Sequence, residues 1–196
     1  GAYDGNELIG FVLAFAGVRG DQTFLHSHMA AVLPAYQNAG VGRRLKLAQR
    51  ADALARGIRL VEWTFDPLEI RNAYFNLEKL GVIVREYLPD LYGRTTSPLH
   101  AGLPTDRLLA EWWLDSPRVE ARLAGREVAS HASVERIRIS AKIGAWRHAD
   151  PAAAERAQRE VREQFQHWLG KGYAAVGFEI EAASKDGTYL LTPYEG

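Results

Sequence analysis

The stretch that decides the fold is His26-Ser-His-Met-Ala-Ala-Val-Leu-Pro-Ala-Tyr-Gln-Asn-Ala-Gly-Val-Gly42. An apolar run of strand length ends at Pro34, a turn with two glycines covers 37–42, and an amphipathic segment follows. Gly40 and Gly42 can take positive φ and carry no Cβ, so successive backbone N–H groups can converge on one anion. The stretch therefore predicts a strand, a phosphate-cradling turn and a helix, in that order.

The predicted helix adds to this anion site. Its first turn has unpaired N–H groups and the positive end of the helix dipole, and Arg43 and Arg44 follow directly. Residues 37–59 carry six basic side chains against Asp52 alone. Glycines before a helix also form plain turns, and a solvated helix face explains such charge equally well. Both interpretations stay open at this point.

The rest of the first 115 residues predicts a mixed α/β fold. A hairpin turn at 4–6 precedes strands over 8–17 and 23–33, and the helix over 41–56 ends at Gly57. A strand over 60–65, a helix over 69–80, a strand beginning at 82 and a last strand over 108–114 follow. This alternation favours a central mixed sheet flanked by helices.

The chain is expected to consist of a core over 1–115, a linker over 116–133 and a small C-terminal α+β extension over 134–196. Residues 94–106, rich in Pro, Gly, Thr and Ser, predict a long irregular connection within the core. In the extension we expect a strand over 134–139, a helix from Pro151 to about Leu169, and a hairpin around 185–187.

Composition narrows the classes of function. Lys plus Arg and Asp plus Glu both number 24, so no global charge attracts nucleic acid or anionic lipid. The chain has no Cys, which removes disulfides, thiolate metal sites and a cysteine nucleophile. No apolar run is long enough to span a bilayer, so a cytoplasmic location is expected. Because Met29 is the only methionine and the chain opens inside an apparent strand, we also expect an N-terminal portion before Gly1.

Several of these motifs together resemble one family. From Gln37 the order Gln-x-x-Gly-x-Gly resembles the pyrophosphate-loop signature of the GNAT superfamily, the acyl-CoA N-acyltransferases. The run over 31–34 resembles that family's fourth strand, whose splayed backbone holds the pantetheine arm. Residues 3 to about 115 resemble a bacterial branch of predicted acetyltransferases, with such segments as Trp63-Thr-Phe-Asp-Pro-Leu68, Asn72-Ala73, Phe75-Asn76, Leu80-Gly81 and Tyr92-Gly93.

The resemblance implies a GNAT-like fold and transfer of an acyl group from acetyl-CoA, or another acyl-CoA, to an amine. The acceptor would be a small molecule or a peptide, and no metal is implied. Carried over by position, Ala31 and Val32 would contact pantetheine. The pyrophosphate would lie on the residues of the loop, which are Gln37, Asn38, Ala39, Gly40, Val41, Gly42 and Arg43.

The helix over 69–80 departs from the family pattern. With Ala73 as the family's alanine, the positions of its Asn and its Tyr hold Ile70 and Leu77, so the usual acid for the CoA thiolate is missing. Asn72 and Asn76, one helical turn apart, are candidate cofactor contacts instead. The candidate proton donors are the tyrosines Tyr74, Tyr87 and Tyr92, although a tyrosine in such a place is more often an amphipathic wall residue.

His26 and His28 are predicted to share one strand face, which makes His28 a candidate general base. Without Cys, and without a carboxylate at ligand spacing, a metal site is not expected. A packed or surface histidine is the alternative interpretation. Trp112 and Trp113 predict either a core cluster or a subunit interface, the latter implying a homodimer.

Three functions remain in view. The leading hypothesis is an acyl-CoA-dependent N-acyltransferase of the GNAT fold. The alternative is a non-catalytic acyl-CoA-binding or regulatory module of the same fold, suggested by Ile70 and Leu77. A nucleic-acid binder that uses the basic helix from Arg43 to Arg59 is weaker, because net charge is zero and no aromatics are interleaved with the basic residues.

Overall fold

The computed structural model describes residues 1–93, 103–128 and 134–194. The chain divides into two compact units, which are described separately below. The first comprises Gly1–Trp63 and Trp112–Pro117, and the second comprises Thr64–Glu111 and Arg118–Gly196. The expected α/β class is confirmed, since the described residues form nine strands and five α-helices.

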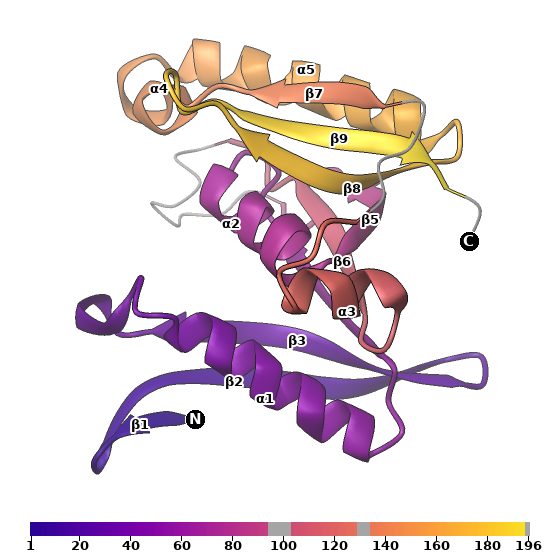
Figure 1. Ribbon diagram of the computed structural model, residues 1–196. Helices are drawn as coiled ribbons and strands as arrows, with labels where there is room; N and C mark the ends of the chain where they lie inside the picture. The colour runs from indigo at the N-terminus through magenta and orange to yellow at the C-terminus, as the bar shows by residue number, and fades with distance from the viewer. Residues whose placement is uncertain (94–102, 129–133, 195–196) are drawn as a thin grey trace. The chain divides into compact units, whose positions relative to one another are not determined.

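The first unit contains four strands and one long helix (Figure 1). Strands β1 (Ala2–Asp4), β2 (Glu7–Arg19) and β3 (Gln22–Val32) pair antiparallel in that order. Strand β4 (Leu60–Phe65), whose last two residues belong to the second unit, pairs parallel with β3. Between β3 and β4 lie the short 3-10 helix η1 (Pro34–Tyr36) and α1 (Val41–Ala55). The predicted hairpin, strands and helix are confirmed.

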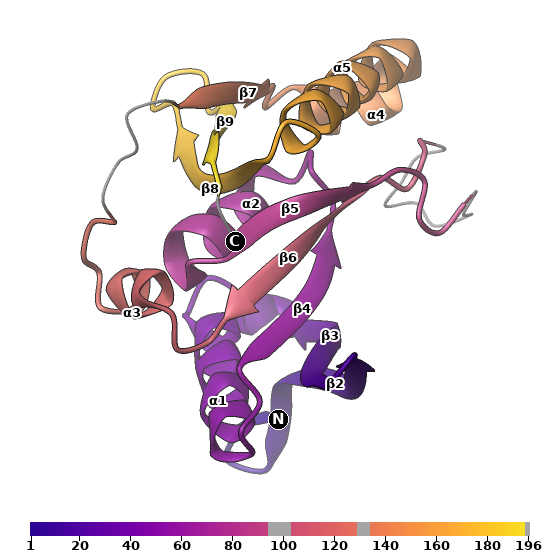
Figure 2. The ribbon, with the colours of Figure 1, turned by 90° about the vertical axis from the view of Figure 1, so that its right-hand side faces the viewer.

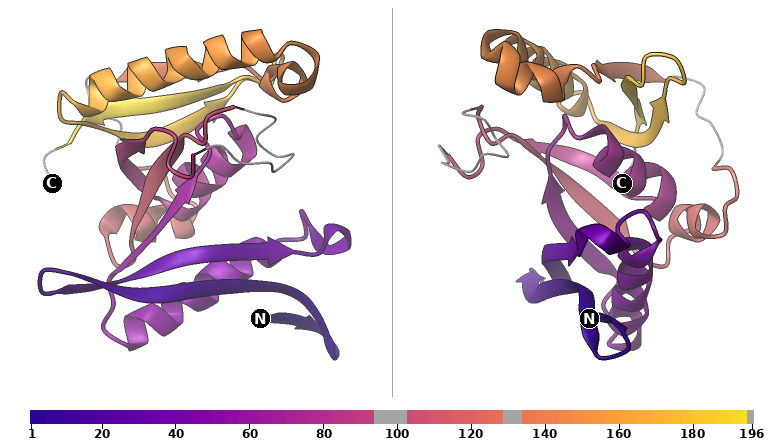
Figure 3. Two further views of the ribbon diagram at one scale, coloured as in Figure 1. Left: turned by 180° about the vertical axis from the view of Figure 1, so that it is seen from behind. Right: turned by 90° about the vertical axis from the view of Figure 1, so that its left-hand side faces the viewer.

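Helix α1 lies across one face of the β2–β3 hairpin (Figure 3). Val41 and Leu45 pack against Ile9 of β2 in a small apolar cluster. Lys46 belongs to the basic run of α1 but is only 7% exposed, whereas Ala48 is exposed. The buried positions of the helix are Val41, Leu45, Lys46, Gln49 and Ala53.

The second unit holds five strands in the order β6 (Arg107–Trp113), β5 (Ile83–Leu88), β8 (Tyr173–Ile180), β9 (Gly187–Pro193) and β7 (Glu135–Ile139). All neighbours in this order pair antiparallel, and Figure 2 shows β5 and β6 side by side. The end of β6 at Trp112 belongs to the first unit, where Trp112 is fully buried edge-on to Trp63. Trp112 is therefore a core residue.

The helices of the second unit differ in part from expectation. The segment predicted as one helix over 69–80 is α2 (Ile70–Tyr74) followed directly by the π-helical turn η2 (Phe75–Leu80). The expected linker over 116–133 contains α3 (Pro117–Leu123), and α4 (Ile143–Ala149) precedes the predicted helix α5 (Pro151–Leu169). Most of the irregular connection predicted over 94–106 lies outside the described residues. The predicted division at 115 and 134 stays a prediction.

Helix α5 is joined to the strands of the second unit by a buried polar cluster. Asp106, 1% exposed, receives two hydrogen bonds from the Arg162 guanidinium, at 2.7 and 2.9 Å. The hydroxyl of Tyr87 donates to the same carboxylate at 2.5 Å. The Phe165 ring lies 5.6 Å from the Tyr87 ring and 5.0 Å from the Tyr189 ring.

No described helix is long and apolar enough to cross a bilayer.

We predict that Asp106→Asn destabilises the protein by about 3 kcal/mol, because a buried ion pair that loses one partner leaves an uncompensated charge. Arg136→Ala is the matched control, since Arg136 pairs with Glu179 while both side chains are 56% exposed. That change should alter the free energy of unfolding by less than about 1 kcal/mol. Urea denaturation followed by circular dichroism measures both, and equal effects would contradict the structural role of Asp106.

Candidate functional site

The turn before α1 has the backbone geometry that an anion site requires. Gly40 takes φ 78° and Asn38 takes φ 62°, both in the left-handed region, and no side chain of the described residues caps the N-terminus of α1. The first helical hydrogen bond runs from the N–H of Arg44 to the carbonyl of Gly40, at 3.0 Å. The N–H groups of the first turn therefore have no acceptor within the helix and point out from its N-terminus. The positive φ expected at Gly40 is confirmed.

Gly42 differs from expectation. It is the second residue of α1 and has a helical backbone. What Gly42 can contribute to ligand binding is therefore the absence of a side chain, and not a positive φ. A Cβ built at this position meets no protein atom within 4 Å. The space beside the first turn of α1 is therefore open.

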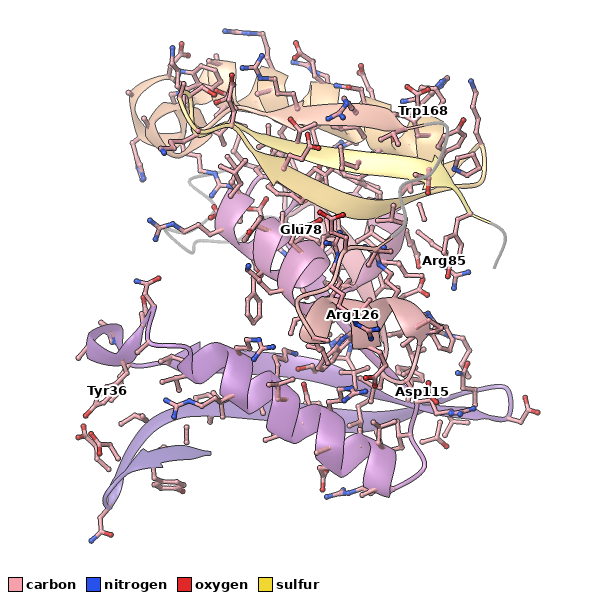
Figure 4. The ribbon with its side chains drawn as sticks, viewed as in Figure 1. Tyr36, Glu78, Arg85, Asp115, Arg126 and Trp168 are labelled. Carbon is pink, nitrogen blue, oxygen red and sulfur yellow. The ribbon has the colours of Figure 1, made fainter. Side chains whose placement is uncertain are left out.

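The first half of the loop that precedes α1 is tied to the sheet by three hydrogen bonds. The side-chain amide of Gln37 donates to the carbonyl of Val32 at 3.1 Å, which closes the loop onto the end of β3. The hydroxyl of Tyr36, labelled in Figure 4, donates to Asp4 at 2.9 Å, and this hydrogen bond raises the pKa of Tyr36. The N–H of Leu33 donates to the carbonyl of Ile9 at 2.9 Å. These contacts hold the loop in place before any ligand arrives.

Strands β3 and β4 form a fork beside this loop. Their parallel pairing comprises only the pairs Leu25–Val61 and His26–Glu62. Within the first unit β3 then continues to Val32 beside β2 alone, with a β-bulge that leaves His28 without a partner in the β2 register. The β3 edge from Ser27 onward therefore presents backbone groups on the side where β4 has parted from it.

Lys46 lies at the point where the fork opens. Its Nζ donates to Ser27 Oγ at 2.9 Å and to Gln49 Oε1 at 3.1 Å, and it lies 3.8 Å from the centre of the Trp63 ring. Ser27 and Trp63 are the first residues after the last β3–β4 pair. Burial lowers the pKa of Lys46 from 10.5 to about 7.

The first unit brings together most of the predicted site residues. His28, Ala31, Val32 and the loop over 37–43 all lie along β3 and at the start of α1. His28 is exposed and shares a face with His26, as predicted, with their ring centres 6.2 Å apart. The contacts of these residues with a cofactor stay predictions.

The other predicted residues belong to the second unit. The buried Asn76 donates its side-chain amide to Asn72 at 3.3 Å. Tyr87 is 8% exposed, and burial, followed by its hydrogen bond to Asp106, raises its pKa far above the ordinary value. Tyr92 is 59% exposed and its hydroxyl lies 2.9 Å from Thr64 Oγ1. Their roles as cofactor contacts and proton donors stay predictions.

The sequence did not reveal Lys46 as a site residue. Basic residues surround it in α1, and a solvated helix face explains such a run of charge without any site. The available signal was its position directly after Leu45, which places it at the border of the buried face.

Among the described residues no group of three or more His, Asp or Glu is arranged to hold a metal ion. The expectation of chemistry without a metal stays a prediction.

In this α/β protein a glycine turn at a helix N-terminus thus lies beside two parting parallel strands, an arrangement that can bind an anionic group. Residues 1–81 match the model of the acetyltransferase (GNAT) family. The match covers the loop from Gln37 whose residue order resembles the signature of that family. A search of curated proteins gave no match.

Solved structures with a similar backbone include several acetyltransferases. A GNAT family acetyltransferase from Elizabethkingia anophelis with acetyl-CoA bound is 18% identical, with a TM-score of 0.47 over 57% of this chain and 72% of that one. Chaetomium thermophilum Naa20 in complex with a bisubstrate analogue is 18% identical, with a TM-score of 0.45 over 64% and 66% of the two chains. Arabidopsis thaliana NAA60 in complex with acetyl-CoA is 17% identical, with a TM-score of 0.46 over 57% and 70%.

The buried lysine predicts a specific pH dependence of stability. Because the pKa of Lys46 falls from 10.5 in the unfolded chain to about 7 in the folded protein, the unfolded chain binds more protons between these two pH values. The free energy of unfolding should therefore rise with pH across this window, by up to about 1.4 kcal/mol per pH unit, relative to Lys46→Met. Urea denaturation of both proteins across the window measures the difference, and parallel pH curves would contradict it.

Proposed function

We propose that this protein is an acyl-CoA-dependent N-acyltransferase that transfers an acetyl group from acetyl-CoA to an amine of a small molecule or peptide. The single observation that carries the proposal is the arrangement within the first unit, where an uncapped helix N-terminus adjoins the open fork of β3 and β4. The first feature suits a pyrophosphate and the second suits an extended, amide-bearing arm. CoA contains both groups in this order.

The residues of the first unit divide the binding task between them. The backbone N–H groups around Gly40 and Gly42 would hold the pyrophosphate, with Arg43 adding positive charge. Ala31 and Val32 would meet pantetheine, whose amides can pair with the open edge of β3 as a short additional strand does. Asn72 and Asn76 are the further cofactor contacts that the sequence predicts.

Acyl transfer of this kind requires few catalytic side chains. A neutral amine attacks the thioester carbonyl, a C–N bond forms, the C–S bond breaks, and CoA leaves as a thiolate. A backbone N–H at the bulge around His28 would polarise the carbonyl, which the freedom of that residue from the β2 register supports. The exposed His28 ring is the candidate base for the proton that the amine loses.

A non-catalytic acyl-CoA-binding module is the second candidate, favoured by one observation. Leu77 occupies the position of the tyrosine in the family pattern and is fully buried in the apolar core. A leucine there cannot donate a proton to the thiolate. Turnover separates the two candidates, because the module binds CoA without releasing it from acetyl-CoA.

We predict that Gly42→Val weakens CoA binding by at least about a hundredfold, or about 3 kcal/mol, because the new side chain fills the space beside the phosphate-binding N–H groups. Gly144→Val is the matched control. Gly144 is also the second residue of a helix, and a Cβ there likewise meets nothing within 4 Å. Calorimetric titration with CoA measures both variants, and unchanged affinity in Gly42→Val would show that the loop is a plain turn.

Turnover is measured by the thiol released from acetyl-CoA in the presence of a panel of amines and peptides. The protein contains no Cys, so every thiol detected belongs to CoA. We expect acceptor-dependent release with the parent protein and with Gly144→Val, and loss of release with Gly42→Val. CoA binding without release for any acceptor would favour the binding module, and absence of CoA binding would contradict both candidates.

A further inference from the structure

Among the residues that the structure describes, the ammonium group of Lys46 has only neutral partners. Its Nζ contacts the Ser27 hydroxyl, the Gln49 amide and the face of the Trp63 ring, and the residue is 7% exposed. A buried cation whose contacts are all dipoles and an aromatic face is held in place but not neutralised. The fork therefore contains a lysine whose charged form a bound anion would stabilise.

The other charged groups around Lys46 are committed elsewhere or lie on other faces. Glu62, next to Trp63 on β4, is bound through both oxygens by Arg19 at 2.8 and 2.9 Å. By strand alternation His26 and His28 project from the face of β3 opposite Ser27. The remaining titratable side chains on α1 are Arg43, Arg44, Arg50, which donates to the carbonyl of Leu114, and Asp52, which pairs with Arg56.

The position of Lys46 along β3 matches the length of the pantetheine arm. From Val32, where the phosphate-binding loop begins, to Ser27 is five residues, or about 16 Å at the rise of a strand. An extended pantetheine arm that starts from a pyrophosphate on the loop and follows β3 covers a comparable length. Its sulfur would then reach the opening of the fork, where the ammonium group lies.

We propose that Lys46 stabilises the CoA thiolate that leaves when the acyl group is transferred, an inference that rests on the proposed function. The amine nitrogen forms a bond to the thioester carbon, the C–S bond breaks, and its electron pair goes to the sulfur. The thiolate forms an ion pair with the Lys46 ammonium and takes its proton from water when CoA departs. The proton lost by the amine passes to the His28 ring, the candidate base, and from there to solvent, so the protein is unchanged at the end.

This role accounts for the departure at Leu77. A family member with a tyrosine at that position has an acid for the thiolate, whereas here the position is apolar and buried. The hydroxyl of Tyr87 already donates its proton to Asp106, so Tyr87 is a poor replacement for that tyrosine as the acid. The positive charge of Lys46 on α1 stabilises the same leaving group, the CoA thiolate, without a proton transfer.

The test uses CoA itself as the probe and needs no acceptor. A nearby ammonium group lowers the pKa of a thiol, so the thiol of CoA bound to the parent protein should ionise at least about one pH unit below that of free CoA. Ultraviolet absorbance of the thiolate, followed as pH is raised, measures this ionisation. No protein thiol interferes, because the chain contains no Cys.

Three variants make the measurement specific. Lys46→Met should bind CoA with an affinity within about threefold of the parent and return the thiol pKa to the value of free CoA. Lys46→Arg should keep it lowered, since the charge remains. Lys171→Met is the control, because Lys171 also stacks on an aromatic ring, that of Trp168 at 5.0 Å, but lies in the second unit. It should behave as the parent does.

Each outcome decides the question. A lowered thiol pKa that is lost only in Lys46→Met supports the proposal. An equal thiol pKa in the parent and Lys46→Met, with CoA bound to both, overturns it while the proposed function stands. If Lys46→Met does not fold, the parent alone decides, because a bound thiol that ionises at or above the pKa of free CoA overturns the proposal. Absence of CoA binding to the parent overturns both proposals.

Discussion

The pairing between β3 and β4 stops after two residue pairs, and the candidate site depends on that stop. Parallel strands that continued to pair would cover the edge of β3 from Ser27 to Val32. The bulge at His28 supplies a physical reason, because an extra residue bends and twists a strand just beyond the last pair. The same short segment thus opens the fork and frees backbone groups for a ligand.

The loop before α1 serves the fork because it starts where β3 ends. Gln37 binds back to Val32, and Gly40 turns the chain into the helix without a side-chain cap. The donors of the helix N-terminus and the open edge of β3 are thereby continuous. Neither feature alone distinguishes a cofactor site from an ordinary strand-to-helix connection, whereas the two together match a ligand with a phosphate head and an amide-bearing arm.

At Lys46 the charge pattern of α1, which is typical of an exposed helix face, disagrees with the buried position of the side chain in the structure. Burying an ammonium group beside an apolar cluster is unfavourable, and the contacts with Ser27, Gln49 and Trp63 offset only part of that cost, as its lowered pKa shows. Local rules are often broken at functional sites, where the chemistry requires a group that stability alone would exclude. The place of this lysine at the opening of the fork fits that explanation.

The sequence by itself determined the hairpin, the strand over 60–65, the start of α1, the positive φ at Gly40 and the end of α1 at Gly57, because these follow from turn residues and from short-range periodicity. Only the tertiary structure decided that Lys46 is buried, that Gly42 is helical, that the segment over 75–80 is π-helical, and that β3 and β4 part after His26 and Glu62. These features depend on which surfaces meet across the fold, and a periodic pattern within one element carries no information about its partner.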